Sequence, residues 1–511
     1  MKVHRMSAAL AMPWTRATPL RAVSAPLAVR SGSPVACALP LPALIAPPRN
    51  QPAPPPEWSR QILYFPMTDR FYDGDPANNQ GVDRGQPAGF HGGDLAGLIQ
   101  KLDYVQSLGV TALWLSPMAA NTQGNHHCGY HGYWIRDHNR VEEHQGDLAT
   151  ARRTVDEAHR RGMKVVLDVV LNHVGPDHPF LSDPARRDWF HTLGDIKDWN
   201  DQHQVENGRI AGLPDLAQEN PAVYEFLLEN TAWWIQQLGV DGIRLDAVKH
   251  VSKEFWQRFL PDLKARVGKD LFVVGEVLHG DPGYVAAYQR AGVDYLFDFP
   301  LCFAIRNVFG RDGSARELGR IFAQDSQYVD PSHMVTLIDN HDFSRFVSDA
   351  QGDTRARLKL ALAFLMSARG LPSVYYGTEV GLEGGNDPDN RRMMEFERDP
   401  ELRSYFTRVT SLRRSLPALQ AGTQREMWQD DQVFAFSRQV PGQEAIAVFN
   451  NGPETARRRI PLRAESRLPD GTVLRDLLSG QTLQVRDRHL EIELASKNPM
   501  ILVPEGSTPC I

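Results

Sequence analysis

The sequence predicts an α/β protein, a (β/α)8 TIM barrel with a small insert after the third strand and a C-terminal antiparallel β-sandwich. From Gln61 onward, short β-rich apolar runs alternate with amphipathic segments of helical length, which indicates successive βα units. Eight such runs are present, and eight parallel strands close a barrel. After about Leu416 the pattern changes to short alternating strands with Gly and Asp turns, which is typical of antiparallel sheets.

The eight expected strands share an apolar stem, and in several of them this stem ends in carboxylates, amides or histidines. In chain order they occupy residues 62–71, 110–118, 164–173, 240–248, 271–278, 295–300, 334–342 and 371–381. Active sites of such barrels lie at the carboxyl ends of the strands. The polar residues at these ends are therefore the first candidates for a functional site.

Composition shifts divide the chain into parts. We expect residues 57–415 to form the barrel and residues 416–511 the sandwich. Residues 174–216 are polar, irregular and too long for an ordinary βα loop, so they are expected to form the insert. Residues 1–56 contain no Asp or Glu and end in a Pro-rich run, which predicts a disordered leader and linker.

The leader leaves the compartment open. A secretory signal has an apolar stretch of about 7 to 15 residues after its basic start, but Met6 to Met12 is short and is followed by Pro13 and Arg16. A targeting segment, an Arg-rich transit segment and a mis-set start codon all explain this composition. A secreted or periplasmic location is favoured over a cytoplasmic one.

Charge and cysteine content exclude several classes of function. The chain has 56 Lys and Arg against 62 Asp and Glu, which offers no electrostatic footprint for nucleic acid. No window reaches the roughly 18 consecutive apolar residues of a membrane span. The four cysteines, which are Cys37, Cys128, Cys302 and Cys510, form no CxxC pair, so neither a disulfide framework nor a structural zinc site is expected. We expect a monomer without a membrane partner.

Four segments at the predicted strand ends carry the chemistry. They are DVVLNH (168–173), GIRLDAVKH (242–250), GEV (275–277) and IDNHD (338–342). Each alone is weak evidence, because an acidic residue after a strand is most often a solvated end or a helix cap. Together, in this order, they resemble the four signature segments of the alpha-amylase family of glycoside hydrolases, and LPDL (213–216) resembles its fifth. The resemblance covers residues 61–504.

The resemblance implies a pair of reacting carboxyl groups. Retaining hydrolysis of a glycosidic bond uses two such groups about 5 to 5.5 Å apart. Asp246 matches the nucleophile, Glu276 the general acid/base, and Asp342 the third carboxylate, which favours the oxocarbenium-like state. Like-charge repulsion is expected to raise one pKa and to leave Glu276 protonated near neutrality. Arg244 is expected to keep the nucleophile ionised and to contact substrate, or else to form a structural ion pair with it.

The resemblance also implies a set of sugar-binding residues. His173 and His341 match histidines that hydrogen-bond the sugar, and Tyr133 matches a ring that stacks on it. The remaining members of the set are His131 beside this ring, Lys249 on the acceptor side, and Asp387 with Arg391 on the donor side. An aromatic platform suits the apolar face of a glucose ring. For Tyr130 and Trp134 we expect ordinary core packing instead.

Calcium is the implied cofactor, because hard cations take carboxylate, amide and carbonyl oxygens. Asn172, Asp215 and the carbonyl of His250 match the family's calcium site between barrel and insert. A second site resembles that of the cyclodextrin-forming branch and related amylases. Its implied residues are Asp73, Asp75, Asn78 and Asn79 of DGDPANN and Gly92 and Asp94 of GGD. A polar turn capped by Asx side chains is the alternative for this second stretch.

The reaction type is judged from the features that the chain shares with one branch of the family and from two features in which it departs from that branch. DGDPANN, YHGYW, GGNDPDNR and IDNHDFSRF resemble the cyclodextrin glucanotransferase branch. That branch carries a bulky aromatic four residues before the calcium Asp of the fifth segment, where this chain has Ala211. The chain also leaves no room for that branch's extra C-terminal starch-binding domains. Both departures favour an alpha-amylase that hydrolyses alpha-1,4 bonds in starch, glycogen or maltodextrins. A glucanotransferase-like or other alpha-glucan transglycosylase is the alternative.

A non-catalytic glucan-binding protein on the same barrel is the alternative from a different functional class. Such relatives typically lack one or more of the acids. Here Asp246, Glu276 and Asp342 are all present, which favours an enzyme.

Overall fold

The computed structural model describes residues 57–124 and 128–506. The leader predicted over residues 1–56 lies outside the described residues, and so do Cys37 and Cys510. Within the described ranges, no helix is both long enough and apolar enough to cross a membrane.

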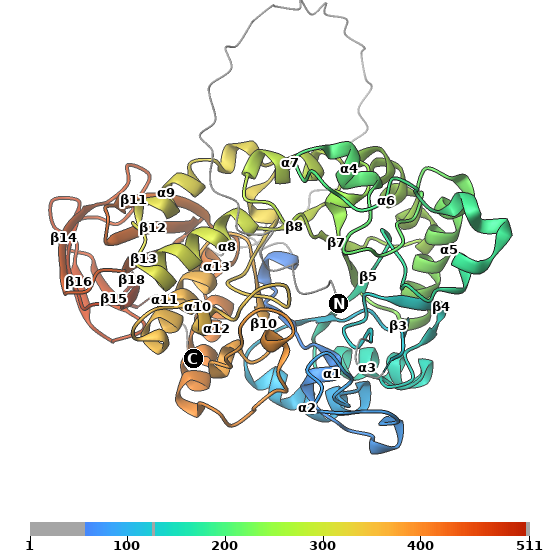
Figure 1. Ribbon diagram of the computed structural model, residues 1–511. Helices are drawn as coiled ribbons and strands as arrows, with labels where there is room; N and C mark the ends of the chain where they lie inside the picture. Colours follow the sequence, from blue (N-terminus) through green and yellow to red (C-terminus); the bar gives the residue numbers. More distant parts are fainter. Residues whose placement is uncertain (1–56, 125–127, 507–511) are drawn as a thin grey trace, which may run out of the picture. The chain divides into compact units, whose positions relative to one another are not determined.

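Eight parallel strands form a closed barrel in the order β1-β10-β9-β8-β7-β6-β5-β2 (Figure 1). The strands are β1 (Leu63–Phe65), β2 (Ala112–Leu115), β5 (Lys164–Val169), β6 (Gly242–Leu245), β7 (Phe272–Gly275), β8 (Tyr295–Phe297), β9 (Met334–Thr336) and β10 (Leu371–Tyr375). Each lies within one of the eight predicted runs, so the predicted fold class is confirmed. The strands are shorter than the runs because the polar end of each run belongs to the following loop.

Helices connect the strands and cover the barrel. They are α1 (Thr68–Phe71), α2 (Leu95–Ser107), α3 (Leu148–Arg160), α5 (Pro221–Leu238), α6 (Lys253–Val267), α7 (Pro282–Arg290), α8 (Phe299–Ile305), α9 (Arg316–Phe322), α10 (Phe346–Asp349), α11 (Thr354–Ser367), α12 (Pro400–Ser415) and α13 (Pro417–Ala421). Sequence signals fix their ends: Asn220 caps α5 by accepting from the Ala222 amide, and Gly239 (φ 73°) ends it. Gly is favoured there because this left-handed backbone strains other residues.

The barrel interior is apolar and aromatic. The strands are covered on both faces, so they read as nearly continuous apolar runs. Phe65 stacks on Trp114 with ring centroids 3.9 Å apart, and both side chains are buried. This packed centre leaves the strand ends as the place where polar groups gather.

Two segments extend from the barrel near the strand ends. The antiparallel pair β3 (Ala119–Asn121) and β4 (Ile135–Val141) follows β2. The sequence did not indicate this pair, because its strands are short or strongly polar. The segment after β5 contains η4 (Pro179–Ser182), η5 (Pro184–Trp189) and α4 (Gln202–Asn207). The isolated bridges His173↔Asp215 and Phe190↔Leu216 hold its two ends together.

Antiparallel sheets form the C-terminal part, as predicted. The six-stranded sheet contains β11 (Thr423–Gln429), β12 (Val433–Val440), β13 (Gln443–Asn450), β18 (Pro499–Pro504), β15 (Val473–Asp476) and β16 (Thr482–Gln484), and the two-stranded sheet contains β14 (Ala456–Pro461) and β17 (His489–Leu494). Ile446, Ile460 and Leu490 place both sheets in one apolar cluster. The larger sheet also packs on the barrel helices, since Phe364 of α11 lies 5.2 Å from Phe449 of β13 between ring centroids.

Candidate active site

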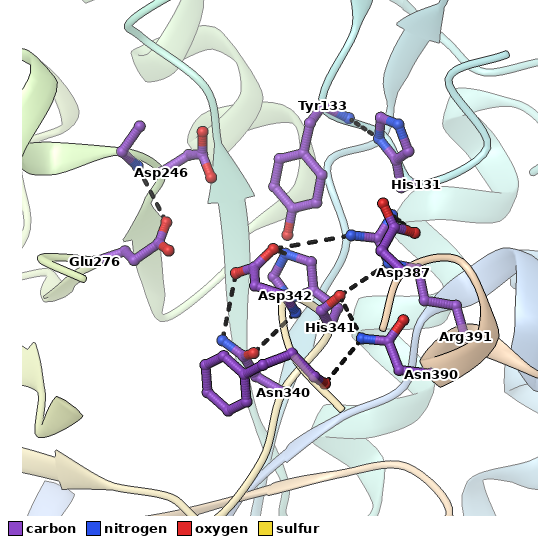
Figure 2. Close-up of polar contacts among 12 residues, drawn as sticks. His131, Tyr133, Asp246, Glu276, Asn340, His341, Asp342, Asp387, Asn390 and Arg391 are labelled. Carbon is purple, nitrogen blue, oxygen red and sulfur yellow. Dashed lines mark hydrogen bonds and ion pairs between the residues drawn. The ribbon is translucent and has the colours of Figure 1, made fainter. Parts of the chain in front are cut away.

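Three carboxyl groups gather at the carboxyl ends of the barrel strands. Asp246 and Glu276 directly follow β6 and β7, and Asp342 lies in the loop after β9. Asp246 and Glu276 are buried, whereas the side chain of Asp342 is 28% exposed. Figure 2 shows Asp246 and Glu276 on one side, with Asp342, His341 and Tyr133 beside them. The acids that the sequence singled out therefore occupy one site.

Arg244 of β6 holds two of these acids on one guanidinium group. Its Nη1 lies 2.6 Å from Asp246 Oδ1 and its Nη2 lies 2.6 Å from Glu276 Oε2. Its Nη1 also donates to Asp168 Oδ1 at 2.9 Å. Charge-assisted hydrogen bonds of this kind are short and fix geometry. The predicted Arg244–Asp246 ion pair is present, and it is part of a larger network.

Ala247 adopts a left-handed backbone conformation, which turns the chain beside Asp246 and Glu276. Ala247 has φ 51°, a value that is uncommon for a residue other than Gly. The turn directs its amide to Glu276 Oε2 at 3.2 Å. Unfavourable backbone of this kind persists where surrounding contacts over-determine it. Here, Asp246 N donates to Val169 O and Glu276 N donates to Leu245 O, each at 3.0 Å.

Burial controls the protonation of these acids. Burial, together with the charges of Asp342 and Asp246, raises the pKa of Glu276 to about 7 against the opposing effect of Arg244. The direction agrees with the sequence prediction, and the predicted like-charge repulsion contributes to it, but burial is the larger cause. Burial also raises the pKa of Asp246, again opposed by Arg244. For Asp342, burial raises the pKa and Arg391 opposes the shift.

Four predicted sugar-binding residues meet beside Asp342. The Tyr133 and His341 rings stack at 5.1 Å between centroids with an angle of 5°. His341 Nε2 lies 3.3 Å from Asp342 Oδ1. His131 Nδ1 accepts from the Tyr133 amide at 3.1 Å, and His173 Nε2 lies 3.1 Å from the Tyr133 carbonyl. Burial lowers the pKa of His173 to about 4, so this ring is neutral near pH 7.

The predicted donor-side loop reaches the same place. Arg391, at the end of η11 (Asp389–Arg391), lies 3.1 Å from Asp387 Oδ1 and 3.8 Å from Asp342 Oδ1. Its Nε donates to the His341 carbonyl at 2.9 Å. Its Nη1 also donates to the Tyr130 hydroxyl at 3.2 Å. Tyr130 is buried as the sequence suggested, but its hydroxyl belongs to this polar network rather than to the core alone.

Lys249 lies at the edge of the site. It belongs to η6 (Val248–His250), and its Nζ donates to the Leu278 carbonyl at 2.9 Å. Its ammonium lies 5.6 Å from the centre of the Trp199 ring, and Trp199 is 41% exposed. Burial lowers the pKa of Lys249 and the charge of Glu276 opposes this shift, which places the side chain within electrostatic reach of the acids.

The first predicted calcium site has two unsatisfied oxygens. Asn172 Oδ1 and Asp215 Oδ1 are buried and have no hydrogen-bond partner among the described residues. Asp215 Oδ2 is 2.6 Å from His191 Nδ1, and His250 is buried at the end of η6. Buried polar atoms normally find a partner, so the two free oxygens fit a hard cation. Within the described ranges, no group of three or more His, Cys, Asp or Glu side chains is placed to hold a metal.

The second predicted site has three unsatisfied oxygens. They are Asp73 Oδ1, Asn78 Oδ1 and Asn79 Oδ1, which are buried and lack partners among residues 57–124 and 128–506. Gly92 has φ 87°, and a Cβ there would lie 2.6 Å from Asn79 Oδ1, so only glycine leaves the space in front of this oxygen open. An amide and carboxylate oxygen set of this kind fits Ca²⁺.

Two other residues of that predicted site act as caps. Asp94 caps α2 by accepting from the Gly97 amide at 2.6 Å and accepts from the Asp75 amide at 2.8 Å. Asp75 accepts from the Ala77 amide at 3.1 Å. These contacts are those of an Asx-capped turn, which the sequence left open as the alternative.

Sequence reasoning missed several polar neighbours of the acids. Asn340 Oδ1 accepts from the Asp342 amide at 2.9 Å, and Asn390 Nδ2 donates to the His341 carbonyl at 2.8 Å. Asp168 accepts from Arg244 and from the Tyr133 hydroxyl. All three lie inside segments already singled out, but their residue types alone carried no assignment.

Comparison with known proteins decides the family. The family model described as the catalytic domain of alpha amylase matches residues 65–439. The chain belongs to the alpha-amylase family. It is 39% identical over 459 residues to a beta/alpha-amylase of Paenibacillus polymyxa, which covers 86% of this chain but only 37% of that protein's length. It is 32% identical over 465 residues to a cyclomaltodextrin glucanotransferase of Klebsiella oxytoca, covering 78% of this chain and 71% of that protein.

Solved structures of alpha-amylase family members share the fold. An Anoxybacillus alpha-amylase is 44% identical with a TM-score of 0.84, covering 88% of this chain and 98% of that one. A Geobacillus thermoleovorans alpha-amylase solved with acarbose is 40% identical with a TM-score of 0.82, covering 88% and 99%. The chain is therefore a glycoside hydrolase of this family.

A transferase shares the fold as well. It is a cyclomaltodextrin glucanotransferase described as the first with a three-domain ABC distribution, 31% identical with a TM-score of 0.79, covering 87% of this chain and 99% of that one. A three-domain arrangement therefore does not by itself separate hydrolases from transferases, contrary to the argument made from the sequence.

Proposed function

We propose that this family member is an alpha-amylase, which hydrolyses internal alpha-1,4-glucosidic bonds of starch, glycogen or maltodextrins with retention of configuration. The observation that carries the proposal is the Arg244 guanidinium, which binds Asp246 and Glu276 at 2.6 Å each through neighbouring nitrogens. Two carboxyl groups held this closely suit the double displacement of retaining enzymes.

In the proposed reaction, Asp246 attacks the anomeric carbon while Glu276 gives its proton to the leaving glycosidic oxygen. The bond from sugar to Asp246 forms as the bond to the leaving sugar breaks. Glu276, now a carboxylate, then takes a proton from water, whose oxygen attacks the anomeric carbon and releases Asp246. The raised pKa of Glu276, about 7, supports its service as both acid and base near neutral pH.

The residues around Asp342 are proposed to bind the sugar at the reacting bond. Tyr133 supplies a ring platform, while Asp342 and His341 accept or donate hydrogen bonds to its hydroxyls, with His131 and His173 alongside. Asp387 and Arg391 are proposed to hold the next sugar on the donor side, and Lys249 an acceptor sugar. Arg391 donates to the His341 carbonyl at 2.9 Å, so donor-side binding and the orientation of His341 are linked.

Calcium is proposed as a structural cofactor at both predicted sites. Asn172, Asp215 and the His250 carbonyl would hold one ion, and Asp73, Asn78 and Asn79 would form the core of the second, with Asp75, Gly92 and Asp94 around it. When bound, Ca²⁺ supplies charge that satisfies the unpaired oxygens and holds the loops in place. Metal content after dialysis and the unfolding temperature with and without chelator test the proposal that both sites bind calcium.

We expect bound calcium in the dialysed protein and a lower unfolding temperature in chelator. The Asn79→Ala variant should hold about one ion fewer than the wild type.

Hydrolysis is favoured over transfer by Ala211. This residue is exposed and has φ 53°, and it offers no ring on which an acceptor sugar could stack in competition with water. The names of several relatives support the alternative, a cyclomaltodextrin glucanotransferase or another alpha-glucan transglycosylase.

Product analysis tests the reaction type. Purified protein is incubated with soluble starch and calcium, and the products are separated by chromatography. Linear maltooligosaccharides are expected, and cyclic or elongated glucans would establish the transferase alternative. Asp246→Asn should abolish cleavage while maltooligosaccharide binding remains. Cleavage at the wild-type rate by this variant would exclude Asp246 as the nucleophile.

A further inference from the structure

Asp342 is held differently from the other two acids of the site. Its Oδ1 lies 3.3 Å from His341 Nε2 and 3.8 Å from Arg391 Nη2. Its Oδ2 lies 3.4 Å from Asn340 Nδ2. Hydrogen bonds weaken at such lengths, whereas the other two acids each lie 2.6 Å from a nitrogen of Arg244. The position of the Asp342 carboxyl group therefore depends largely on the main chain that carries it.

The main chain on either side of Asp342 is held by a buried side chain, that of Asn390 (Figure 2). Its Nδ2 donates to the His341 carbonyl at 2.8 Å and to the Phe343 carbonyl at 3.0 Å. Both partners are acceptors, so only the amide nitrogen can face them. These two hydrogen bonds fix the residues directly before and after Asp342.

Asn390 is held in turn by the loop that it supports. Its own carbonyl accepts from Arg345 Nε at 2.8 Å, and Arg345 is buried two residues after Phe343. The Arg345 amide also donates to the Gly384 carbonyl at 2.9 Å. The loop after β9 and the segment 384–391 are therefore joined in both directions, by a side chain from each.

The segment that holds Asp342 also carries the proposed donor-side contacts. Asp387 and Arg391 lie on either side of Asn390 in the chain, with Arg391 Nη1 3.1 Å from Asp387 Oδ1. Arg391 Nε donates to the same His341 carbonyl that Asn390 contacts. A sugar bound by Asp387 and Arg391 would thus act on the chain that carries Asp342. Binding energy from a remote sugar raises kcat when it is used at the reacting centre.

We propose that Asn390 is a positioning residue, which holds Asp342 through the carbonyls on either side of it and joins Asp342 to the donor-side segment. The inference rests on the proposed function for its meaning in catalysis. It assigns Asn390 no contact with the sugar. Loss of its two donated hydrogen bonds is therefore expected to lower kcat, because kcat depends on the geometry of the acids, and to leave KM nearly unchanged.

Steady-state kinetics of Asn390→Asp and Asn390→Ala on a chromogenic maltooligosaccharide test the proposal. Asn390→Asp keeps the shape of the side chain but replaces its donor with an oxygen that faces two carbonyls. We expect kcat of both variants to fall by about 10- to 100-fold and KM to change by less than about threefold. A wild-type kcat in either folded variant would overturn the proposal.

The pH dependence of the two variants separates the hydrogen bonds from packing. At low pH the carboxyl group introduced by Asn390→Asp is protonated and can donate one of the two lost bonds. The ratio of kcat in this variant to kcat in wild type should therefore rise about fivefold between pH 8 and pH 5. The ratio for Asn390→Ala should not change with pH. An equal pH dependence of both ratios would contradict a role through hydrogen bonds.

Substrates of different length test the connection to the donor-side segment. Cleavage is compared between maltooligosaccharides whose donor part does or does not reach Asp387 and Arg391, and chromatography of the products identifies the bond that is cut. In wild type the longer donor part should raise kcat by about tenfold, and in Asn390→Ala by less than about twofold. No gain in wild type, or the wild-type gain in Asn390→Ala, would overturn this connection.

Asn450 of β13 offers a matched control. It is buried as well, and its Nδ2 donates to the carbonyls of Glu454, Leu494 and Ala495 at 2.8, 2.9 and 3.0 Å. Asn450→Asp makes the same chemical change in the C-terminal sheet. It should lower stability, but kcat of the folded protein should stay within about twofold of wild type. A loss of kcat equal to that of Asn390→Asp would contradict a specific role of Asn390.

Crystal structures of these variants provide a readout that needs no activity. In Asn390→Asp residues 341–343 should move by about 1 Å relative to wild type, and in Asn450→Asp they should keep their place. An unmoved Asp342 in Asn390→Asp would overturn the inference even if starch is cleaved. Failure of the wild type to cleave any alpha-glucan would overturn the proposed function, whereas the place of Asp342 in the two variants would still decide whether Asn390 holds it.

Discussion

Two groups of buried arginines in this molecule have opposite surroundings. Arg244, at the strand ends of the barrel, faces three carboxyl groups, and their charges, set against burial, hold its pKa well above the usual value. Arg413 of α12 donates instead to main-chain carbonyls, including those of Gly370 at 2.6 Å and Leu419 at 2.9 Å. Burial lowers its pKa to about 9.

The difference teaches that buried charge alone does not indicate a reaction site. Arg413 and Arg438 donate to carbonyls at the end of α11, such as those of Met366 and Ser367. A helix carboxyl end favours a cation, so these arginines stabilise the packing of α11, α12 and β12. At Arg244 the partners are acids in excess of the positive charge, and burial together with the neighbouring acids raises the pKa of Glu276 to about 7. The identity of the partners separates the structural case from the proposed catalytic one.

The largest expected effect is on chemistry at the Arg244 group. Glu276→Gln removes the proposed proton donor with little change in shape, so kcat should fall by about 10²- to 10⁴-fold. The free energy of unfolding should change by less than about 1 kcal/mol. Steady-state kinetics and denaturant unfolding of the same preparation measure both. A fall in stability with unchanged kcat would show that Glu276 has a structural role, and would contradict the proposed difference between the surroundings of Arg244 and Arg413.

Removal of Arg413 should show the reverse pattern. Arg413→Met leaves several buried carbonyls without donors, and the free energy of unfolding should fall by about 3 kcal/mol. The kcat of the remaining folded protein should stay within about twofold of wild type, because none of these carbonyls touches the proposed site. Chemical unfolding and active-site titration provide the two readouts. A hundredfold loss of kcat at full stability would show that the two regions are not independent.

The wild-type pH profile sharpens the comparison further. Glu276 must be protonated to donate, so kcat/KM should decline as pH rises through its pKa of about 7. Kinetics between pH 4 and pH 9 on a short maltooligosaccharide would locate this limb. A profile that stays flat above neutrality would mean that another group provides the proton.

A smaller effect, on stability, is expected at another buried ion pair, which joins His144 to Glu142. His144 Nδ1 lies 2.7 Å from Glu142 Oε1, and its Nε2 lies 2.8 Å from the Gln80 carbonyl. Both partners are acceptors, so the doubly protonated ring satisfies both. Glu142 and the Gln80 carbonyl raise the pKa of His144 although burial opposes them, and hydrogen bonds from His144 and the Asn121 amide lower the pKa of Glu142 against burial.

The directions of these two pKa shifts determine how the stability of the protein changes with pH. The raised pKa of His144 gives stability that is complete below its unfolded pKa, about 6.5, and is lost as pH rises through the folded pKa. The lowered pKa of Glu142 gives stability that is complete above its unfolded pKa, about 4.3, and is lost as pH falls through the folded pKa. Thermal unfolding between pH 5 and pH 9 should show a loss of about 1 kcal/mol at the alkaline end. In His144→Gln this alkaline loss should disappear.

Much of the site was predictable because its residue types stand in local patterns. Asp246, Glu276 and Asp342 each follow an apolar strand at a position that the chain order makes specific. Asp168 stood in one of those patterns too, but its partner Arg244 is 76 residues away. The Tyr130 hydroxyl meets Arg391 across 261 residues. No local pattern encodes such a meeting, so the roles of these two side chains were not predictable.

The sequence by itself determined the barrel, the antiparallel C-terminal sheets and the residues at the strand ends, because hydrophobic period and residue type act over short stretches of chain. Only the tertiary structure decided which acids share Arg244, which oxygens near the two predicted calcium sites lack partners, and that burial outweighs like charge at Glu276. These properties depend on distance and on the exclusion of water. Closure of the barrel sets both, since it brings strands distant in sequence to one buried edge.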